Sequence, residues 1–365
     1  MNMNSHQSKQ ISKEARLEQA LSRAIDFLYE NQLRYGEFKT LLASDAALTR
    51  NCEFDSSPFA TSLVVYSLVY VQDPRVKEMI EKGLNFLESE MEWPGFWRYY
   101  SSRQPKRWRV PPDLEDTACI SYVLKMYGRI FPQNKGIFLK NKNSHGIFLT
   151  WLTPRYKLLF RPRMSLMLLW AEFISRIQTS TPDMPEHLRN LPRFRSKKDP
   201  VPPEAIDPSI NASVVLYLGE NAQTRAAINY IIDLIESGQE EGASSFYPDS
   251  ITLYYMIARA YLHSAPSFGC LKELVVRRIA QRQEKSGSMG TILFTALAAC
   301  VLLSFKAHTP ALHKAIQYLT DTQKSEGSWS RYALYSGPIE FWGSEELTTA
   351  FCVEALARYR NITQH

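Results

Sequence analysis

The sequence predicts an all-α fold, a single (α/α)6 toroid barrel of six inner and six outer helices. Two observations predict it: a helix–turn–helix pattern that repeats along the 365 residues, and an alternation of charged helices with nearly charge-free ones. Hydrophobic residues make up 45% of the chain and charged residues 22%, which is the composition of a globular protein with a sizeable core. An open solenoid of the same helix pairs is the alternative architecture.

The repeat consists of an amphipathic helix, a Gln or another polar residue, Gly-x-aromatic, a loop and a second, more apolar helix. Glycine suits the left-handed turn that ends a helix, and the aromatic residue after it can pack back onto that helix. The clearest copies have the spacing Gln-x3-Gly-x-hydrophobic and are Gln32–Gly36–Phe38, Gln283–Gly287–Met289 and Gln323–Gly327–Trp329. Looser copies are Glu90–Gly95–Trp97, Asn141–Gly146–Phe148 and a degenerate one around Gly242 and Phe246.

The second helix of each repeat is predicted to be an inner helix. Several of these helices carry few charges, as in GTILFTALAACVLLSF, so they should be buried on all sides. The first helices carry charge on one side, as in ARLEQALSRAIDFLYENQ, and should face solvent. The predicted inner helices are 55–71, 113–128, 207–219, 249–263, 290–305 and 343–359.

The domain organisation predicted from this pattern is a disordered tail over residues 1–13 and a single barrel over 14–363. A basic, Pro-rich insertion at about 152–206 interrupts the barrel. Its segment 158–177 has a long apolar face flanked by arginines. This segment is compatible with a peripheral membrane contact, although an outer helix of the third repeat is the favoured interpretation.

Composition also bears on location and partners. Five widely spaced cysteines have no ligand-pair spacing, which argues against a disulfide framework and a zinc site. The polar N-terminus lacks the apolar core of a signal peptide, so a cytoplasmic location is predicted, with peripheral membrane attachment as an option. The net charge of +6 favours anionic partners in general, but no recognised nucleic-acid-binding module accompanies the basic runs.

The segment Pro-Pro-Asp-Leu-Glu-Asp-Thr-Ala, residues 111–118, is the most informative stretch. Asp113 is placed to cap a helix, and Asp116 lies one turn later on the same face, beside Glu115. Acidic residues are common at helix N-termini, so capping alone is one interpretation. In the other, crowded carboxyls retain a proton, and the helix N-terminus stabilises the anion that remains after the proton leaves. Such an acid suits the protonation of a carbon–carbon double bond.

A carbocation formed in this way needs aromatic faces nearby, because ring quadrupoles stabilise cations. Arginines before the acids can hold a diphosphate or carboxylate, although a solvated loop or neutralisation of nearby acids is the favoured interpretation of these charges. The candidate substrate-binding residues are Trp97, Tyr99, Trp108, Tyr254, Tyr255, Tyr335 and Trp342 for the rings, and Arg107 and Arg109 for the charges.

Two stretches together resemble a known family. DLEDTA at 113–118 resembles the Asp-x-Asp-Asp-Thr-Ala motif of class II terpene cyclases of the squalene–hopene cyclase group, and QKSEGSW at 323–329 resembles their repeats. The resemblance implies that Glu115 donates the proton to a terminal alkene or epoxide, while Asp113 and Asp116 tune its acidity. Glu115 is one methylene longer than the family's Asp. The family holds substrate between two barrels, whereas one barrel is predicted here, so the insertion, a homodimer or a pocket within one barrel would supply the missing wall.

The resulting hypothesis is an acid-initiated cyclase or isomerase of a linear isoprenoid or a prenylated small molecule. It needs no cofactor, and Mg²⁺ enters only if the substrate carries a diphosphate. The alternatives are a non-catalytic toroid that binds lipid or protein, and a hydrolase that pairs these acids with a second carboxylate. Candidates for that carboxylate are Glu340, Glu345 and Glu346. The sequence shows no Asp-Asp-x-x-Asp run, zinc ligand set or Gly-rich phosphate loop.

Overall fold

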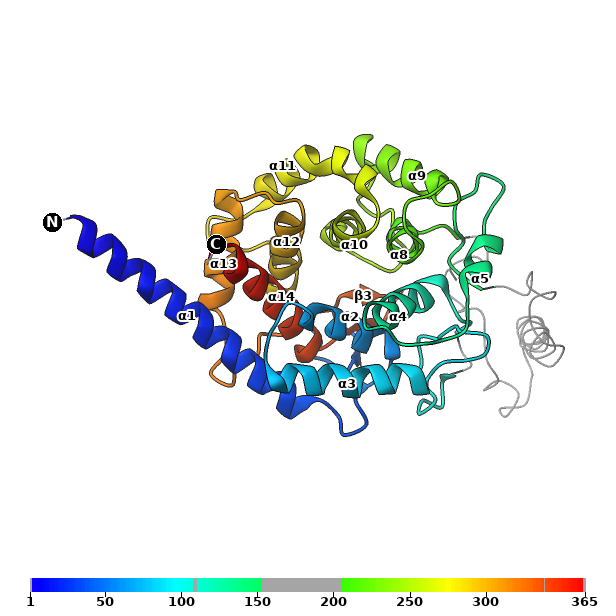
Figure 1. Cartoon of the computed structure of the whole chain (residues 1–365), viewed down its shortest axis with the longest axis horizontal. Helices are drawn as coiled ribbons and strands as arrows, with labels where there is room; N and C mark the ends of the chain where they lie inside the picture. Colours follow the sequence, from blue (N-terminus) through cyan, green and yellow to red (C-terminus); the bar gives the residue numbers. More distant parts are fainter. Residues whose placement is uncertain (1, 108–109, 153–204, 338, 364–365) are drawn as a thin grey trace.

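The computed structural model describes residues 2–107, 110–152, 205–337 and 339–363 (Figure 1). In these ranges, six inner helices form a ring. Each contacts the next along the chain, and the last contacts the first, so the ring is closed. The predicted (α/α)6 toroid is therefore confirmed over the open solenoid. The inner helices are α2 (Pro58–Leu68), α4 (Leu114–Met126), α8 (Pro208–Leu218), α10 (Ser250–His263), α12 (Ile292–Ser304) and α14 (Glu345–Thr363).

Six outer helices in the described part of the chain surround the ring (Figure 1). The difference between the two layers follows from their side chains. Helix α12 has no charged residue and is buried on every face from Leu293 to Ser304, whereas α9 and α13 bury only one face. The outer helices are α1 (Asn2–Asn31), α3 (Pro74–Ser89), α5 (Lys135–Lys140), α9 (Arg225–Glu236), α11 (Lys272–Arg282) and α13 (Pro310–Asp321), and the 3₁₀ helix η3 (Pro266–Leu271) precedes α11.

The Gln-x3-Gly repeat joins neighbouring outer helices. Gly327 has a φ of +93°, as the predicted left-handed turn requires. The Gln323 amide donates to the carbonyl oxygen of Gly327 at 2.8 Å and to that of Ala20, in α1, at 2.8 Å. One side chain thus fixes its own turn and also holds the next helix. The same pair of bonds recurs from Gln32 to Gly36 and Met79, and from Gln283 to Gly287 and Ala311.

A small antiparallel sheet at the start of the last repeat was not predicted. Its strand order is β2-β1-β4-β3, so β1, from the first repeat, pairs with β4, from the last. Strands of two or three residues are too short to show the alternating pattern by which strands are recognised in a sequence. The strands are β1 (Leu41–Ala43), β2 (Glu53–Phe54), β3 (Tyr335–Ser336) and β4 (Phe341–Gly343).

The N-terminus differs from the sequence prediction. Helix α1 begins at Asn2, so residues 2–13, predicted as a disordered tail, are helical in the structure, and the start of the helix projects away from the ring (Figure 1). The first 31 residues contain no Pro or Gly, so no residue type there ends the helix early.

The predicted insertion at 152–206 lies almost wholly outside the described residues, and so does the candidate membrane contact at 158–177. Helix α5, before the insertion, occupies the outer position between α4 and α8 (Figure 1). None of the helices in the described ranges is long and apolar enough to cross a membrane.

Candidate functional site

The three motif acids lie at the N-terminus of inner helix α4. Asp113 is its N-cap, with Oδ1 accepting a hydrogen bond from the backbone N–H of Asp116 at 2.8 Å. The loop from the next repeat holds this turn in place. Leu114 N–H donates to the Thr150 carbonyl oxygen at 3.0 Å, and Leu152 N–H donates to Pro112 at 2.9 Å. The capping interpretation of Asp113 is therefore correct, and it leaves the side chains of Glu115 and Asp116 for other roles.

All three carboxyls have raised pKa values. Burial raises the pKa of Asp113 to about 6. Asp116 is 2% exposed, and burial, followed by the charges of Asp113 and Glu115, raises its pKa well above the usual range. Oδ2 of Asp116 has no hydrogen-bond partner in the described structure. Burial and mutual repulsion thus favour the protonated forms of these carboxyls, as expected for crowded buried acids.

Glu115 is 6% exposed and points toward α8, where the Ser213 hydroxyl donates to its Oε1 at 3.3 Å. Burial raises the pKa of Glu115 well above the usual range, and the charge of Asp207 and then that of Asp113 raise it further. The hydroxyls of Tyr247 and Ser213 oppose this shift by hydrogen bonding. Glu115 is therefore a buried acid whose surroundings favour the protonated form.

Asp207 is a site residue that the sequence analysis missed. It caps α8 and is 1% exposed, and it accepts hydrogen bonds from Ser209 N–H at 2.9 Å, the Ser244 hydroxyl at 2.7 Å and Ser245 N–H at 2.9 Å. Burial raises the pKa of Asp207, and these hydrogen bonds oppose that shift by stabilising the carboxylate. The available signal was its position: Asp207 begins the inner helix next to α4, just as Asp113 begins α4.

Three of the predicted aromatic residues form a cluster beside the acids. The hydroxyls of Tyr99 and Tyr335 lie 3.1 Å apart, and Tyr335 stacks on Trp342 with ring centroids 6.0 Å apart. Tyr247, which bonds to Glu115, packs edge-on against Tyr335 at 6.4 Å. The charge of Asp116 also contributes to the raised pKa of Tyr335, after burial. The structure thus brings Tyr99, Tyr335 and Trp342 next to the carboxyl group.

A second buried acid, Asp55, supports this cluster and was also missed. The Trp342 indole N–H donates to Asp55 Oδ2 at 2.7 Å, and Asp55 is 1% exposed. Burial raises the pKa of Asp55 to about 6. Asp55 precedes α2, so first-repeat and last-repeat residues meet here.

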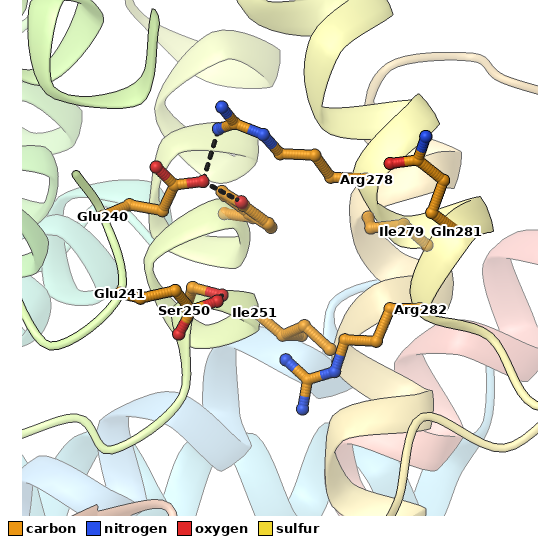
Figure 2. Close-up of a pocket in the computed structure, with 9 residues that line it drawn as sticks. Glu240, Glu241, Ser250, Ile251, Arg278, Ile279, Gln281 and Arg282 are labelled. Carbon is orange, nitrogen blue, oxygen red and sulfur yellow. Dashed lines mark hydrogen bonds and ion pairs between the residues drawn. The ribbon is translucent and has the colours of Figure 1, made fainter. Parts of the chain in front are cut away.

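The structure gives the other described aromatic candidates different surroundings. Trp97 is fully buried in the core, and its indole N–H donates to Leu87 O at 2.7 Å. The Tyr254 hydroxyl donates to Glu240 at 2.6 Å, and both residues line an open pocket of about 380 Å³ between α10 and α11. Figure 2 shows Glu240 and Arg278 of this pocket. Tyr255 donates to Glu354 at 2.7 Å. The sequence analysis grouped these rings with the acids because helix position alone does not show which way a side chain points.

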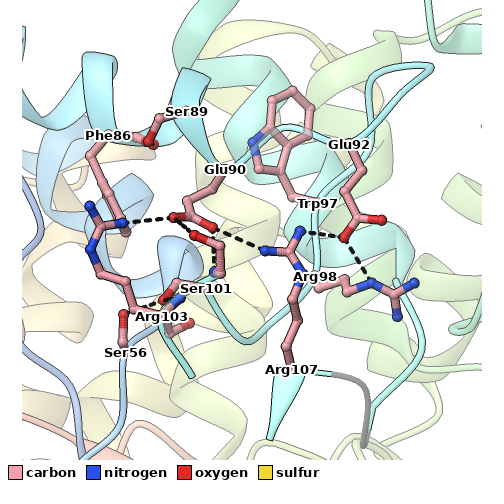
Figure 3. A network of polar contacts seen from close by, with 12 residues as sticks. Ser56, Phe86, Ser89, Glu90, Glu92, Trp97, Arg98, Ser101, Arg103 and Arg107 are labelled. Carbon is pink, nitrogen blue, oxygen red and sulfur yellow. Dashed lines mark hydrogen bonds and ion pairs between the residues drawn. The ribbon is translucent and has the colours of Figure 1, made fainter. Parts of the chain in front are cut away.

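The basic loop before the acids is an ion-pair network (Figure 3). Arg107 contacts Glu92 at 2.6 Å and Glu90 at 3.5 Å, Arg98 contacts Glu92 at 2.9 Å, and Arg103 contacts Glu90 at 3.0 Å. Arg107 therefore neutralises nearby acids, which is one form of the interpretation favoured from the sequence. Its predicted substrate contact is not part of this arrangement, because the guanidinium faces the end of α3. Trp108 and Arg109 lie outside the described residues.

Within the ranges that the structure describes, no group of three His, Cys, Asp or Glu side chains is arranged to hold a metal ion.

Several solved structures share this fold. A protein from Actinoplanes has a TM-score of 0.66 at 15% identity, covering 94% of this chain and 99% of its own. The type II terpene cyclase MstE from Scytonema, in complex with its substrate geranylgeranyl dihydroxybenzoate, has a TM-score of 0.63 at 15% identity, covering 96% and 99%. The ent-copalyl diphosphate synthase from Streptomyces platensis has 0.55 at 14% identity, covering 82% and 50%.

No protein-family model and no curated protein matches the sequence. At 14–15% identity, the structural likeness establishes a shared architecture rather than a shared activity. The chain has the helical toroid fold that type II terpene cyclases also have.

Proposed function

We propose that the protein is an acid-initiated, class II-type cyclase or isomerase of a linear isoprenoid or a prenylated small molecule. The observation that carries the proposal is the buried Glu115, whose pKa is raised well above its usual range, with Asp113 and Asp116 beside it and Tyr247 linking it to the aromatic cluster. A protonated carboxyl in a polar cleft would suit sugar hydrolysis, whereas rings beside the acid suit a hydrocarbon cation.

In the proposed reaction, the Glu115 carboxyl transfers its proton to one carbon of a terminal alkene, or to the oxygen of an epoxide. The adjacent carbon becomes cationic, and the π electrons of the next double bond attack it to form a ring bond. The last cation loses a proton to a base, or takes up water and then loses a proton. Substrate and product thus have the same mass unless water is added.

The residues around Glu115 fit both states of this acid. Before transfer, the negative charge of Asp207 favours the protonated form. After transfer, the hydroxyls of Ser213 and Tyr247 and the N-terminus of α4 stabilise the carboxylate. Asp113 caps the helix start through the backbone N–H of Asp116, and the charge of Asp113 raises the pKa of Glu115. This division of roles needs no cofactor, and Mg²⁺ would serve only a diphosphate on the substrate.

The faces of Tyr99, Tyr335 and Trp342 would stabilise the cation after it forms. Ring quadrupoles attract a cation without reacting with it, a contribution of roughly 0.5–2 kcal/mol per ring. Trp342 is oriented by Asp55 and Tyr335, so the ring face is fixed before substrate binds.

A single barrel is compatible with this chemistry. The match to the Scytonema cyclase covers 96% of this chain and 99% of that one, so one barrel is nearly the whole of both chains. This supports a reaction without the second barrel that the family resemblance implied. A homodimer and a membrane contact at 158–177 stay predictions from the sequence.

The proposal is tested by incubating the purified protein with a panel of linear isoprenoids, both diphosphates and prenylated aromatics, and analysing extracts by mass spectrometry. Glu115→Gln removes the proton donor with little change in shape. Glu345→Gln is the matched control, because Glu345 lies in the first turn of α14 and pairs with Lys324. The expected result is a product of unchanged or water-shifted mass from wild type and Glu345→Gln, but not from Glu115→Gln.

Equal product from Glu115→Gln and wild type would remove Glu115 from the role of donor. Tight binding of the panel with no product from any member would favour a lipid-binding toroid instead.

A further inference from the structure

A buried arginine side chain extends from one inner helix to the inner helix on the opposite side of the ring. Arg259 belongs to α10, is 1% exposed, and places its guanidinium 4.0 Å from the ring centroid of Tyr66. Tyr66 belongs to α2, on the far side of the ring from α10 (Figure 1). Arg259 lies nine residues after the start of α10, so its Cα is roughly 13 Å along the axis from the end that holds the acids.

Two nitrogens of this guanidinium have no hydrogen-bond partner. Nη1 donates to the Met256 sulfur at 3.6 Å, whereas Nε and Nη2 are buried and unpaired in the described structure. Nε and Nη2 form one edge of the guanidinium, and that edge matches the two oxygens of a carboxylate or phosphate. The open edge is thus a donor pair with the geometry for an anion.

The neighbouring carboxylate is already engaged. Glu354 pairs with Arg358 at 2.9 Å and accepts hydrogen bonds from Ser67 at 3.0 Å and Tyr255 at 2.7 Å. None of the described carboxylates lies within 4 Å of the Arg259 guanidinium. Arg259 is therefore a fixed buried cation without a counterion.

Around Arg259, the buried positive charges outnumber the negative charges by one. Glu354 neutralises one of the two arginines, and burial together with those arginines lowers the pKa of His263 to about 4, so the imidazole is neutral at pH 7. Tyr66, Tyr255 and Cys119, the other titratable neighbours, have pKa values raised above their usual range and are neutral too. A buried unpaired charge is costly, so an anion bound here would gain from complementing it.

The cluster adjoins accessible space. Tyr66 packs against Tyr122 at 6.3 Å and against His263 at 5.8 Å; Tyr122 is half-buried and His263, at the C-terminal end of α10, is exposed. The Tyr66 hydroxyl also bonds to the imidazole Nε2 of His263 at 2.9 Å. Arg259 thus lies behind a layer of rings, farther along the barrel axis than Glu115.

We propose that Nε and Nη2 of Arg259 bind the carboxylate or phosphate of a ligand that occupies the barrel interior. This deepens, and in part rests on, the proposed function: the isoprenoid substrate carries an acidic head group that binds Arg259 while its alkene faces Glu115. The two residues lie roughly 12 Å apart along the axis, counted as eight helical residues from the start of each helix. A short isoprenoid chain spans that distance.

The test is a binding titration by intrinsic tryptophan fluorescence with three probes of one chain length: farnesol, farnesoic acid and farnesyl phosphate. Arg259→Met removes the charge and keeps the length, and Arg259→Lys keeps the charge without the paired donors. Arg282→Met is the control, because Arg282 lies at the end of the outer helix α11 and pairs with Asp249, the N-cap of α10. Wild type and the control should bind the two acids about tenfold to hundredfold more tightly than the alcohol.

In the same titration, Arg259→Met should bind all three probes alike, and Arg259→Lys should keep part of the preference. No preference for the acids in wild type, or a preference that survives Arg259→Met, would overturn the proposal. Inorganic phosphate that binds as tightly as farnesyl phosphate would overturn the head-group assignment, because it would mark a site for the free ion.

Two further readouts separate this site from folding and from cyclisation. The melting temperature of ligand-free Arg259→Met should equal or exceed that of wild type, because the variant removes an unpaired buried charge. If the melting temperature of Arg259→Met falls by several degrees and that of Arg259→Lys does not, the charge of Arg259 stabilises the fold, and the proposal is contradicted. Glu115→Gln should keep the preference for acids, so loss of turnover in the panel experiment leaves the anion site independently testable.

Discussion

The close approach at Gly327 gives a quantitative test of how the ring is held together. Gly327→Ala forces a side chain into a φ of +93°, which costs roughly 1–2 kcal/mol, and the new Cβ would collide with the backbone carbonyl oxygen of Arg23 in α1. Relief of that collision displaces α1 and weakens both Gln323 hydrogen bonds, at about 1 kcal/mol each. The free energy of unfolding should therefore fall by about 3–4 kcal/mol.

Gly290→Ala is the matched control for that variant. Gly290 has a nearly equal φ of +90°, and no atom lies within 4 Å of the position its Cβ would take. It should lose only the backbone cost, roughly 1–2 kcal/mol. Chemical denaturation of the two variants beside wild type measures the difference. If the two variants lose equal free energy of unfolding, the contact with α1 does not require glycine at position 327. The backbone conformation would then account for the whole effect.

Three further predictions concern the acids and the loop before them. Asp207→Asn should lower the pKa of Glu115, because it removes a negative charge; activity, which needs the protonated acid, should then be lost at lower pH than in wild type, as a pH–rate profile would show. Asp113→Asn should keep the helix cap and change stability by less than about 0.5 kcal/mol, while turnover falls if Asp113 tunes the acid; unchanged turnover would reduce Asp113 to a cap. Arg107→Met should cost about 2 kcal/mol, because the little-exposed Arg107 pairs with both Glu90 and Glu92, whereas the half-exposed Arg103 pairs with Glu90 alone and Arg103→Met should cost under about 1 kcal/mol; thermal unfolding that ranks them in the reverse order would contradict the network in Figure 3.

The helices were predictable because their signals are local. Inner helices such as α12 lack charge along their whole length, and the Gln323–Gly327 spacing marks the turn between layers. The starts of the acidic helix at Asp113 and of its neighbours follow from capping residues and prolines. The closed ring follows from counting six such pairs.

The parts of the site that were missed depend on contacts between distant repeats. Asp207 meets Glu115, although 92 positions separate them, and Asp55 meets Trp342 across the junction of the first and last repeats. Tyr254 was placed with the acids although it faces outward to Glu240. A helical sequence shows that a residue is near the start of a helix, but the direction of its side chain depends on packing with the neighbouring helix.

The central claim, that Glu115 protonates carbon to start a cyclisation, is tested most directly by running the reaction in D2O. An exchangeable carboxyl then delivers deuterium to the less substituted carbon of the last double bond, because its dimethyl-substituted neighbour becomes the tertiary cation. A cyclised product from an alkene substrate should therefore carry one non-exchangeable deuterium at that less substituted carbon. Mass spectrometry and NMR locate it. Wild type and Glu345→Gln should make this labelled product and Glu115→Gln should not. A cyclised product without deuterium at that carbon, or the same labelled product from Glu115→Gln, would contradict the claim.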